Sequence, residues 1–121
     1  MRYSTPEERF FARLVTLTQY EARVRRNLMF DIDVKFLVSL WNQQQGLCAL
    51  TVKPMSFAKG STINSRTNPD VCTMDRIEPS QGYIKGNIQL TRWLPNRVKI
   101  NLSAEEFLDL CKSVVDTAKT H

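Results

Sequence analysis

The stretch of residues 73–99 constrains this chain more than any other part of its sequence. It reads TMDRIEPSQGYIKGNIQLTRWLPNRVK, in which short apolar runs are separated by turn residues. Its notable polar residues are an adjacent acid and base, the Asn of a Gly-Tyr-x-x-Gly-Asn turn, and an Asn-x-x-Lys pair: Asp75, Arg76, Asn87, Asn96 and Lys99. Polar and turn residues at this density are typical of a site rather than of a core. The stretch contains no histidine, and the only histidine of the chain is its last residue, His121.

The composition is that of a small, basic globular domain. A length of 121 residues suits one domain, and a hydrophobic fraction of 42% is ordinary for a globular protein. The formal net charge is +5 and the pI is about 9.4. This balance favours an anionic partner, most simply nucleic acid, although a basic protein without such a partner can have the same composition.

The three cysteines, Cys48, Cys72 and Cys111, argue against a disulfide framework. Their number is odd and no C-x-x-C pair occurs, so a four-cysteine zinc site is not expected either. A reducing cytoplasm is the simplest compartment for such a chain. No apolar run approaches the roughly 18 residues of a membrane span. The first residues lack the apolar segment of a signal peptide, and we expect no membrane association.

The first helix is predicted over residues 6–28. Thr5 and Glu8 form a T-x-x-E capping box at its start, and apolar residues follow at helical spacing. Its last turns carry Arg25 and Arg26. These arginines could contact phosphate, or they could form a solvated face that also suits the negative end of the helix dipole.

A second helix is predicted over residues 33–45, and β-structure is predicted after it. Trp41 lies on the apolar stripe of this helix, so we expect it in the core rather than stacked on a base. Residues 47–52 are β-like, residues 55–57 could return to a strand, and residues 58–70 read as a polar loop.

The remaining elements are two strands and two helices. A strand is predicted over residues 71–77. Residues 87–91 are predicted as a strand or as an extended entry to a helix over residues 92–101. The last helix begins at Ser103, where an S-x-x-E capping box is present. We expect its apolar stripe to be buried: Phe107, Leu110, Cys111, Val114 and Val115.

The polar residues of the central stretch suggest a phosphodiesterase site with one metal ion. Hard divalent cations prefer carboxylate and amide oxygens, which Asp75 and Asn96 could supply. Asn87 could pin the loop by bonding to backbone groups. Four basic residues could neutralise phosphate oxygens: Arg76, Arg92, Arg97 and Lys99. The alternative is that Asp75 and Arg76 form a surface salt bridge and that Asn87 is only a turn residue.

Four segments together resemble the HNH endonuclease family of the His-Me finger (ββα-metal) group. They are residues 46–51 (GLCALT), 74–79 (MDRIEP), 82–90 (GYIKGNIQL) and 96–99 (NRVK). The closest pattern is a branch with a D-R-I motif that is common in phages and mobile elements. The resemblance extends over residues 41–112 and is carried by the order and spacing of the pieces.

The resemblance implies an α+β fold in one small domain. A ββα-metal finger would occupy residues 46–101. N-terminal helices over residues 1–45 and a C-terminal helix over residues 102–121 would flank it. The implied cofactor is Mg²⁺ or another divalent metal ion, and the implied partner is duplex DNA, in the cytoplasm of a host cell if the protein is phage-encoded.

The family's functional residues can be carried over position by position. Asp75 matches the metal-binding acid on the second strand, and Asn96 matches the His or Asn metal ligand on the helix. Asn87 matches the middle Asn, which braces the loop. Lys99 matches the basic helix residue expected near DNA phosphate. Arg76 stands where most HNH enzymes hold the His that activates the attacking water.

The chain departs from the family pattern at the position of the general-base histidine and at the position of the second zinc-binding cysteine. Arginine stays protonated near neutral pH and therefore cannot act as a general base there. A His often precedes the helix in this branch, about where Arg92 stands. Cys48 matches the first cysteine of versions with structural zinc. Because Thr51 stands at the second, no structural zinc is expected.

Three hypotheses follow from these observations. The first is a metal-dependent DNA endonuclease with Asp75 and Asn96 as metal ligands. Its site residues would be Asp75, Arg76, Asn87 and Asn96 for catalysis and Arg25, Arg26, Arg92, Arg97 and Lys99 for nucleic-acid contact. The second is a catalytically degenerate relative that binds nucleic acid, DNA or RNA, or acts in regulation. The third is a protein-binding module on the same scaffold.

Overall fold

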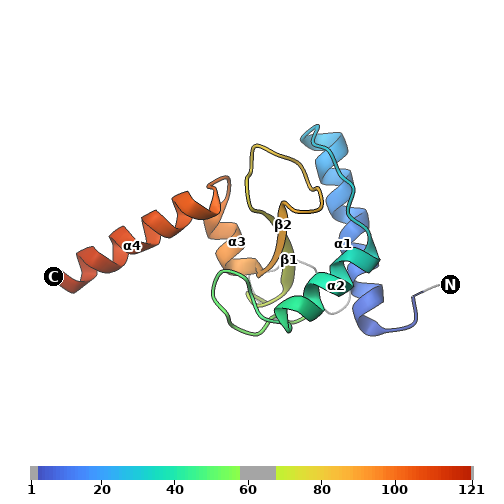
Figure 1. Cartoon of the computed structure of the whole chain (residues 1–121), viewed down its shortest axis with the longest axis horizontal. Coiled ribbons are helices and arrows are strands. Elements are labelled where there is room, and N and C mark those ends of the chain that lie inside the picture. The colour runs from blue at the N-terminus through green and yellow to red at the C-terminus, as the bar shows by residue number, and fades with distance from the viewer. Residues whose placement is uncertain (1–2, 58–67, 121) are drawn as a thin grey trace.

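The computed structural model describes residues 3–57 and 68–120, so most of the predicted loop 58–70 lies outside the described residues. An antiparallel pair of strands lies among helices (Figure 1). The elements in chain order are α1 (Pro6–Tyr20), the π-helical turn η1 (Glu21–Arg25), α2 (Val34–Gln44), β1 (Cys72–Arg76), β2 (Ile88–Arg92), α3 (Trp93–Lys99) and α4 (Ala104–Thr120). This is the α+β class that the sequence predicts. Within the described residues no helix is both long and apolar enough to cross a bilayer.

Local signals in the sequence account for the start of α1. The Oγ1 of Thr5 accepts a hydrogen bond from the Glu8 N–H at 3.1 Å, and the Glu8 carboxylate accepts one from the Thr5 N–H at 3.1 Å. The predicted capping box is therefore confirmed. The helical path continues through η1 and ends at Arg25, with Arg26 as its C-cap, slightly before the predicted residue 28. Asn27 then takes a left-handed conformation at φ 54° and turns the chain back.

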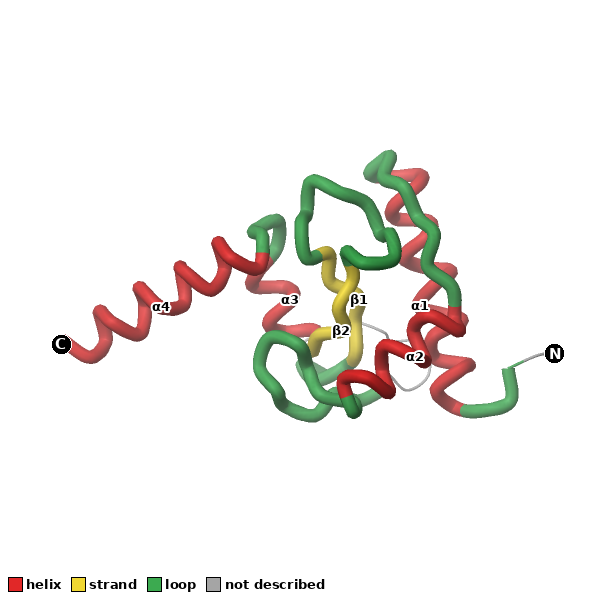
Figure 2. The backbone as a smooth tube through the Cα atoms, viewed as in Figure 1, coloured by secondary structure: helices red, strands yellow, loops and turns green. Residues whose placement is uncertain are grey.

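The middle of the chain forms the finger, which consists of β1, β2 and α3. The two strands pair antiparallel with Asp75 opposite Gln89, and α3 follows β2 directly. Pro95 lies in the first turn of α3, where a missing N–H costs no helical hydrogen bond. Figure 2 shows the strands between α3 on one side and α1 and α2 on the other. The strand, strand and helix predicted over residues 71–101 are confirmed.

The β-structure predicted over residues 47–57 is present only as isolated bridges, between Leu47 and Pro54 and between Ser56 and Val71, and not as strands. The described chain makes a tight turn here, because the Val52 N–H donates to the Cys48 carbonyl at 2.8 Å and Val52 sits at φ 60°. An extended strand has neither feature. The apolar pattern that suggested a strand reflects burial instead, since Cys48 and Met55 are both part of the core.

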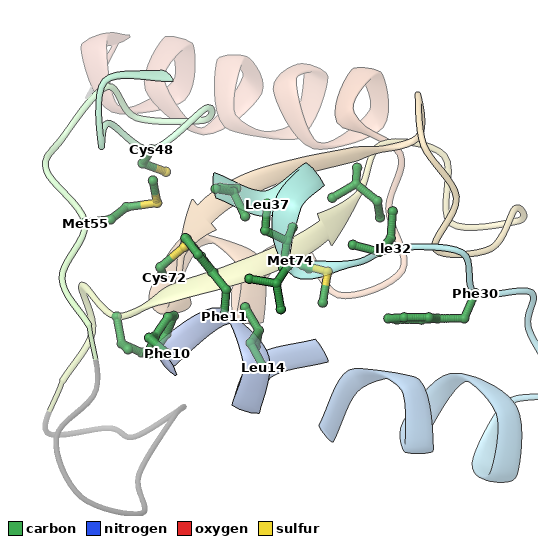
Figure 3. Close-up of a cluster of buried hydrophobic side chains, with 14 of the residues drawn as sticks. Phe10, Phe11, Leu14, Phe30, Ile32, Leu37, Cys48, Met55, Cys72 and Met74 are labelled. Carbon is green, nitrogen blue, oxygen red and sulfur yellow. The ribbon is translucent and has the colours of Figure 1, made fainter. Parts of the chain in front are cut away.

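One hydrophobic cluster holds the N-terminal helices against the finger (Figure 3). Phe11 of α1, Leu37 of α2 and Leu90 of β2 are fully buried in it. Burying side chains of this size contributes roughly 1.5–3 kcal/mol each. The Trp41 ring packs against Phe11 and Phe57 with centroid distances of 6.0 and 4.8 Å, so its predicted place in the core is confirmed.

Backbone hydrogen bonds join the β1–β2 turn to the segment before α2. The Tyr83 N–H donates to the Met29 carbonyl at 2.9 Å, and the Asp31 N–H donates to the Tyr83 carbonyl at 3.0 Å. The Asp31 carboxylate also accepts from the Lys85 N–H at 2.9 Å. At Gly82 a Cβ would stand 2.5 Å from the Met29 carbonyl oxygen, so only glycine fits. The position of this turn is therefore set by residues far away in the sequence.

The buried stripe predicted for the last helix is wrong. Ser103 and Glu106 form the expected capping box, with hydrogen bonds of 3.1 and 2.9 Å, and α4 follows as predicted. None of its residues is buried, however. Val114 and Val115 are 60% and 50% exposed, and α4 extends away from the rest of the chain (Figure 1). The sequence indicates an apolar face correctly but not what covers it.

Candidate functional site

A cavity of about 570 Å³ lies between the N-terminal helical segment and the finger. Residues of α1 and η1 line one wall, residues of β1 and the β1–β2 turn line its base, and residues of α3 line the other wall. Five of the predicted site residues meet here: Arg26, Asp75, Arg76, Asn96 and Arg97. The other predicted site residues do not line the cavity: Arg25, Asn87, Arg92 and Lys99.

Asp75 is held at the base of the cavity by two side-chain contacts. Its Oδ1 accepts from the Lys99 Nζ at 3.0 Å, and its Oδ2 accepts from the Gln89 Nε2 at 2.8 Å. The carboxylate is only 3% exposed. A buried carboxylate needs such partners because the low dielectric interior otherwise disfavours its charge. The alternative of a surface pair between Asp75 and Arg76 is therefore wrong, since Asp75 pairs with Lys99.

The expectation that Lys99 contacts DNA phosphate requires correction. Its side chain is fully buried, and its ammonium donates to Asp75 and to the Arg76 carbonyl oxygen at 3.1 Å. A phosphate outside the protein does not reach a cation in this position. The Asn-x-x-Lys spacing places Lys99 about one helical turn after Asn96, on the same side of α3, so both side chains turn towards β1.

Asn96 lines the cavity, and its side-chain amide is held by two hydrogen bonds. Its amide nitrogen donates to the Thr73 Oγ1 at 2.9 Å and to the Met74 carbonyl at 3.2 Å. These bonds fix the orientation of the amide and use only its nitrogen, so its oxygen keeps its capacity to accept.

Asp75 and Asn96 offer the oxygen donors that a hard divalent ion prefers. A Mg²⁺ ion commonly takes only one or two protein carboxylates and completes its shell with water and substrate phosphate, so this small donor set fits such an ion. Within the described residues no group of three His, Cys, Asp or Glu side chains is gathered as a metal cage. The Lys99 ammonium is the competing cation on Asp75.

Arg76 is fixed along the cavity by the turn that follows β1. Its guanidinium donates to the carbonyl oxygens of Pro79 and Gln81, the latter at 3.3 Å. The guanidinium carbon also lies 5.2 Å from the centre of the Tyr83 ring. A guanidinium held in this way is a preorganised positive charge and not a base.

Asn87 holds the β1–β2 turn through hydrogen bonds between its side-chain amide and the backbone of the turn. Its Oδ1 accepts from the Glu78 N–H at 2.9 Å, and its Nδ2 donates to the Glu78 and Gly82 carbonyls at 3.1 and 2.9 Å. These are the backbone contacts expected of a loop-pinning asparagine. Asn87 therefore acts on the cavity through the turn that carries Tyr83 and the carbonyl partners of Arg76.

The remaining predicted basic residues lie outside the cavity. Arg92 pairs with Asp70 at 2.9 Å, and its side chain is 15% exposed. Arg25 pairs with Glu21 at 3.6 Å on the surface of η1. The exposed Arg25–Glu21 pair contributes little to stability, whereas the Arg92 side chain is mostly buried in its pair with Asp70.

Sequence reasoning missed two residues that shape the site, Gln89 and Tyr83. Gln89 holds Asp75 from the opposite strand, and Tyr83 lies beneath the Arg76 guanidinium. The signal for Gln89 was the antiparallel register, because a hairpin pairs Asp75 with a residue near the start of the second strand. Tyr83 belongs to the Gly-Tyr-x-x-Gly-Asn turn, whose folding over Arg76 is not encoded in spacing.

The comparisons identify the class of fold. A solved structure, described as the rare-cutting HNH restriction endonuclease PacI in a study of DNA perturbation, matches with a TM-score of 0.63. The identity is 18%, and the match covers 96% of this chain and 89% of that chain. No protein-family model and no curated protein matches the sequence. The chain therefore has an HNH-like ββα fold, and this likeness extends over nearly its whole length.

Proposed function

We propose that this protein is an HNH-type endonuclease that hydrolyses phosphodiester bonds in duplex DNA, with the cavity as its active site. The observation that carries the proposal is the convergence of Asp75 and Asn96 with the guanidinium groups of Arg26, Arg76 and Arg97 on one cavity. Oxygen donors beside fixed cations are what phosphodiester hydrolysis requires. The fold shared with an HNH restriction endonuclease supports the same assignment.

In this proposal Asp75 and Asn96 hold a Mg²⁺-like ion. When bound, such an ion supplies Lewis-acid stabilisation of the phosphate and activation of the attacking water. Lys99 and Gln89 orient the Asp75 carboxylate through one hydrogen bond to each of its oxygens. Arg76 places a fixed positive charge beside the phosphate, where negative charge increases during the reaction.

The exposed arginines at the cavity would hold the DNA backbone. Arg26 comes from the end of the N-terminal helical segment and Arg97 from α3, so phosphate contacts would be made from both walls. Asn87 would preserve the turn on which Arg76 depends. Contacts of this kind position the duplex without reading its sequence.

One observation favours a second candidate, DNA binding without cleavage. The Asp75 carboxylate is already neutralised by the buried Lys99 ammonium, which competes with a divalent ion for the same group. The finger also lacks a histidine to serve as general base, a contribution worth roughly 10²–10⁴-fold in rate. In this alternative the arginines keep their contacts with phosphate and the cavity performs no chemistry.

Plasmid nicking in the presence of Mg²⁺, Mn²⁺ or EDTA separates the two candidates. The endonuclease proposal predicts nicking that requires the metal ion and falls by at least about 100-fold in Asp75→Asn. Asn96→Ala provides a second variant that leaves the Asp75–Lys99 pair intact. Asp70→Asn is the matched control, because this acid pairs with Arg92 outside the cavity, and it should retain activity. Circular dichroism of every variant excludes misfolding as the cause.

The alternative predicts a different set of results. Wild-type protein would not nick DNA under any of these conditions but would bind it with an affinity that falls as salt rises. Arg97→Gln should reduce the magnitude of the slope of log K against log[salt] by about 1, whereas Arg25→Gln, which lies outside the cavity, should not. An affinity that is the same at low and moderate salt would contradict both candidates.

A further inference from the structure

Both carboxylate oxygens of Asp75, on which the proposed metal site depends, already have partners. The Lys99 Nζ donates to Oδ1 at 3.0 Å, and the Gln89 Nε2 donates to Oδ2 at 2.8 Å. The same ammonium donates to the Arg76 carbonyl oxygen at 3.1 Å. A divalent ion that binds Asp75 therefore meets a cation that is already bonded to it.

The burial of Lys99 makes it a fixed competitor for Asp75. Its side chain is 0% exposed, and that of Asp75 is 3% exposed. A buried ammonium needs a charged or polar partner, because the interior disfavours an unpaired charge. Both acceptors of Lys99 belong to β1, so the ammonium does not leave Asp75 for solvent as a surface lysine would. Salt also screens a buried pair much less than an exposed one.

The charges around the cavity add to this competition. Among the described residues that line the cavity, together with Lys99, positive groups exceed negative ones: Arg26, Arg76, Arg97 and Lys99 against Glu21 and Asp75, a net charge of +2. The negative charge of Glu21 is itself paired with Arg25 at 3.6 Å. An excess of this sign attracts a phosphate and repels a divalent cation.

A DNA phosphate reverses this balance. Its oxygens would bring negative charge to the cavity and provide the ligands that the protein lacks, since Mg²⁺ commonly binds through one or two carboxylates together with substrate phosphate. We propose that the divalent ion and the DNA phosphate bind the cavity cooperatively, and that Lys99 keeps the metal affinity of the DNA-free protein low. This inference deepens the proposed function and rests on it, because it takes Asp75 and Asn96 as the metal ligands.

Metal binding by the DNA-free, full-length protein tests the role of Lys99. Electron paramagnetic resonance of free Mn²⁺ should give a dissociation constant above about 1 mM for the wild type. Lys99→Met removes the competing charge and should bind Mn²⁺ at least about 10-fold more tightly. Mn²⁺ should also raise the unfolding midpoint of Lys99→Met more than that of the wild type, because the ion then neutralises the buried Asp75 carboxylate.

A second variant keeps the test valid if Lys99→Met does not fold. Arg97 is exposed on α3 and lines the cavity, so Arg97→Gln lowers the local positive charge without disturbing the core. It should bind Mn²⁺ about 3-fold more tightly than the wild type. Lys112→Gln removes the same charge from the exposed face of α4 and is the matched control, with no change expected.

DNA affinity measures the cooperativity itself. Fluorescence anisotropy of a short phosphorothioate duplex, which resists hydrolysis, would be recorded with and without Mn²⁺ at constant ionic strength. Mn²⁺ should raise the affinity of the wild type by at least about 10-fold relative to its effect on Asp75→Asn. The duplex then raises the affinity for Mn²⁺ by the same factor, because the coupling between two ligands is reciprocal.

Three results would overturn the proposal and leave the endonuclease assignment intact, provided that the wild type still nicks plasmid DNA with Mg²⁺. The first is a DNA-free protein that binds Mn²⁺ with a dissociation constant below about 0.1 mM. The second is a Mn²⁺ affinity that neither Lys99→Met nor Arg97→Gln increases. The third is a DNA affinity on which Mn²⁺ has the same effect in the wild type and in Asp75→Asn.

A different result would overturn both proposals. It is a protein that does not nick DNA and binds no Mn²⁺, either as the DNA complex of the wild type or as Lys99→Met. The metal assay and the nicking assay together therefore separate a failure of the coupling from a failure of the endonuclease assignment.

Discussion

The helices α1 and α4 are alike in sequence and opposite in environment. Each begins with a capping box and carries an apolar stripe at helical spacing. The stripe of α1 is buried against α2 and the finger, with Phe11 fully enclosed. In the part of the chain that the structure describes, no residue of the α4 stripe is buried. A local pattern therefore specifies a helix and its apolar face, whereas the tertiary structure decides whether that face belongs to the core.

The same contrast separates the two buried faces of the finger. On one face the cluster around Leu90 closes on the N-terminal helices, and hydrophobic burial is the main source of stability. On the other face Asp75 and Lys99 lie beside the cavity as a buried ion pair. Such a pair is weak evidence for stability, because the cost of removing both charges from water offsets much of their attraction. Its presence beside the cavity is better explained by a role in the site.

The cysteines provide the most sensitive test of the difference between core and α4. Cys48 and Cys72 are buried, and burial raises the pKa of the Cys72 thiol, whereas Cys111 is exposed on α4. In dilute solution we expect Cys111 to react with a thiol reagent like a free cysteine. The other two should react at least about 10³-fold more slowly, since they require unfolding. Pulsed alkylation followed by mass spectrometry measures all three rates in one sample. Rapid labelling of Cys72 in dilute folded protein would contradict the described core.

Truncation of one side chain in each stripe gives the next largest difference. Phe11→Ala should lower the free energy of unfolding by about 3–5 kcal/mol, because it removes a large, fully buried ring. Val114→Ala should change it by no more than about 0.5 kcal/mol in dilute solution, since this side chain is 60% exposed. Urea denaturation monitored by circular dichroism gives both values. Equal effects would mean that α4 belongs to the core.

The helix caps give the smallest difference. Thr5→Ala should lower the free energy of unfolding by about 1 kcal/mol, because α1 unfolds with the core. Ser103→Ala removes the same kind of cap from α4 and should leave the unfolding midpoint unchanged while reducing the helical signal. Thermal unfolding and the far-ultraviolet spectrum separate these outcomes.

The pH dependence of the unfolding free energy tests whether the Glu8 carboxylate causes the stabilisation by the α1 cap. Hydrogen bonds from the Thr5 and Ser4 backbone N–H groups hold the pKa of Glu8 below its usual value. A carboxyl group with a lowered pKa in the folded state stabilises the protein above its unfolded pKa, about 4.3, and loses this contribution as the pH falls through the folded value. Glu8→Gln should therefore reduce the free energy of unfolding at pH 7. Its effect should be smaller at a pH below the folded-state pKa of Glu8. An equal effect at both pH values would exclude the carboxylate as the cause.

The central stretch could be predicted from the sequence because its signals are local. Turn residues, short apolar runs and an early proline place β1, β2 and α3 with little reference to the rest of the chain. Asp75 and Asn96 fall on neighbouring elements of one hairpin-and-helix unit. The predicted elements are therefore enough to bring the two side chains to the same cavity.

The rest of the site depends on tertiary contacts, which the spacing of residues along the sequence does not determine. The resemblance predicts Lys99 near DNA phosphate, but its burial depends on how closely α3 packs on β1, which the spacing does not contain. Arg26 reaches the cavity through the packing of the N-terminal helical segment on the finger. The β-like stretch before residue 58 was misread because burial and strand formation favour the same residue types.

The absence of a side chain at Gly82 has a consequence for how this finger can be inherited or engineered. Its backbone lies directly against that of Met29, so the β1–β2 turn and the chain before α2 have closely complementary surfaces. A hairpin grafted from another scaffold would need a compatible residue here and a host segment that follows the same path. The minimal transferable unit of this architecture is therefore not the finger alone but the finger together with its N-terminal helices.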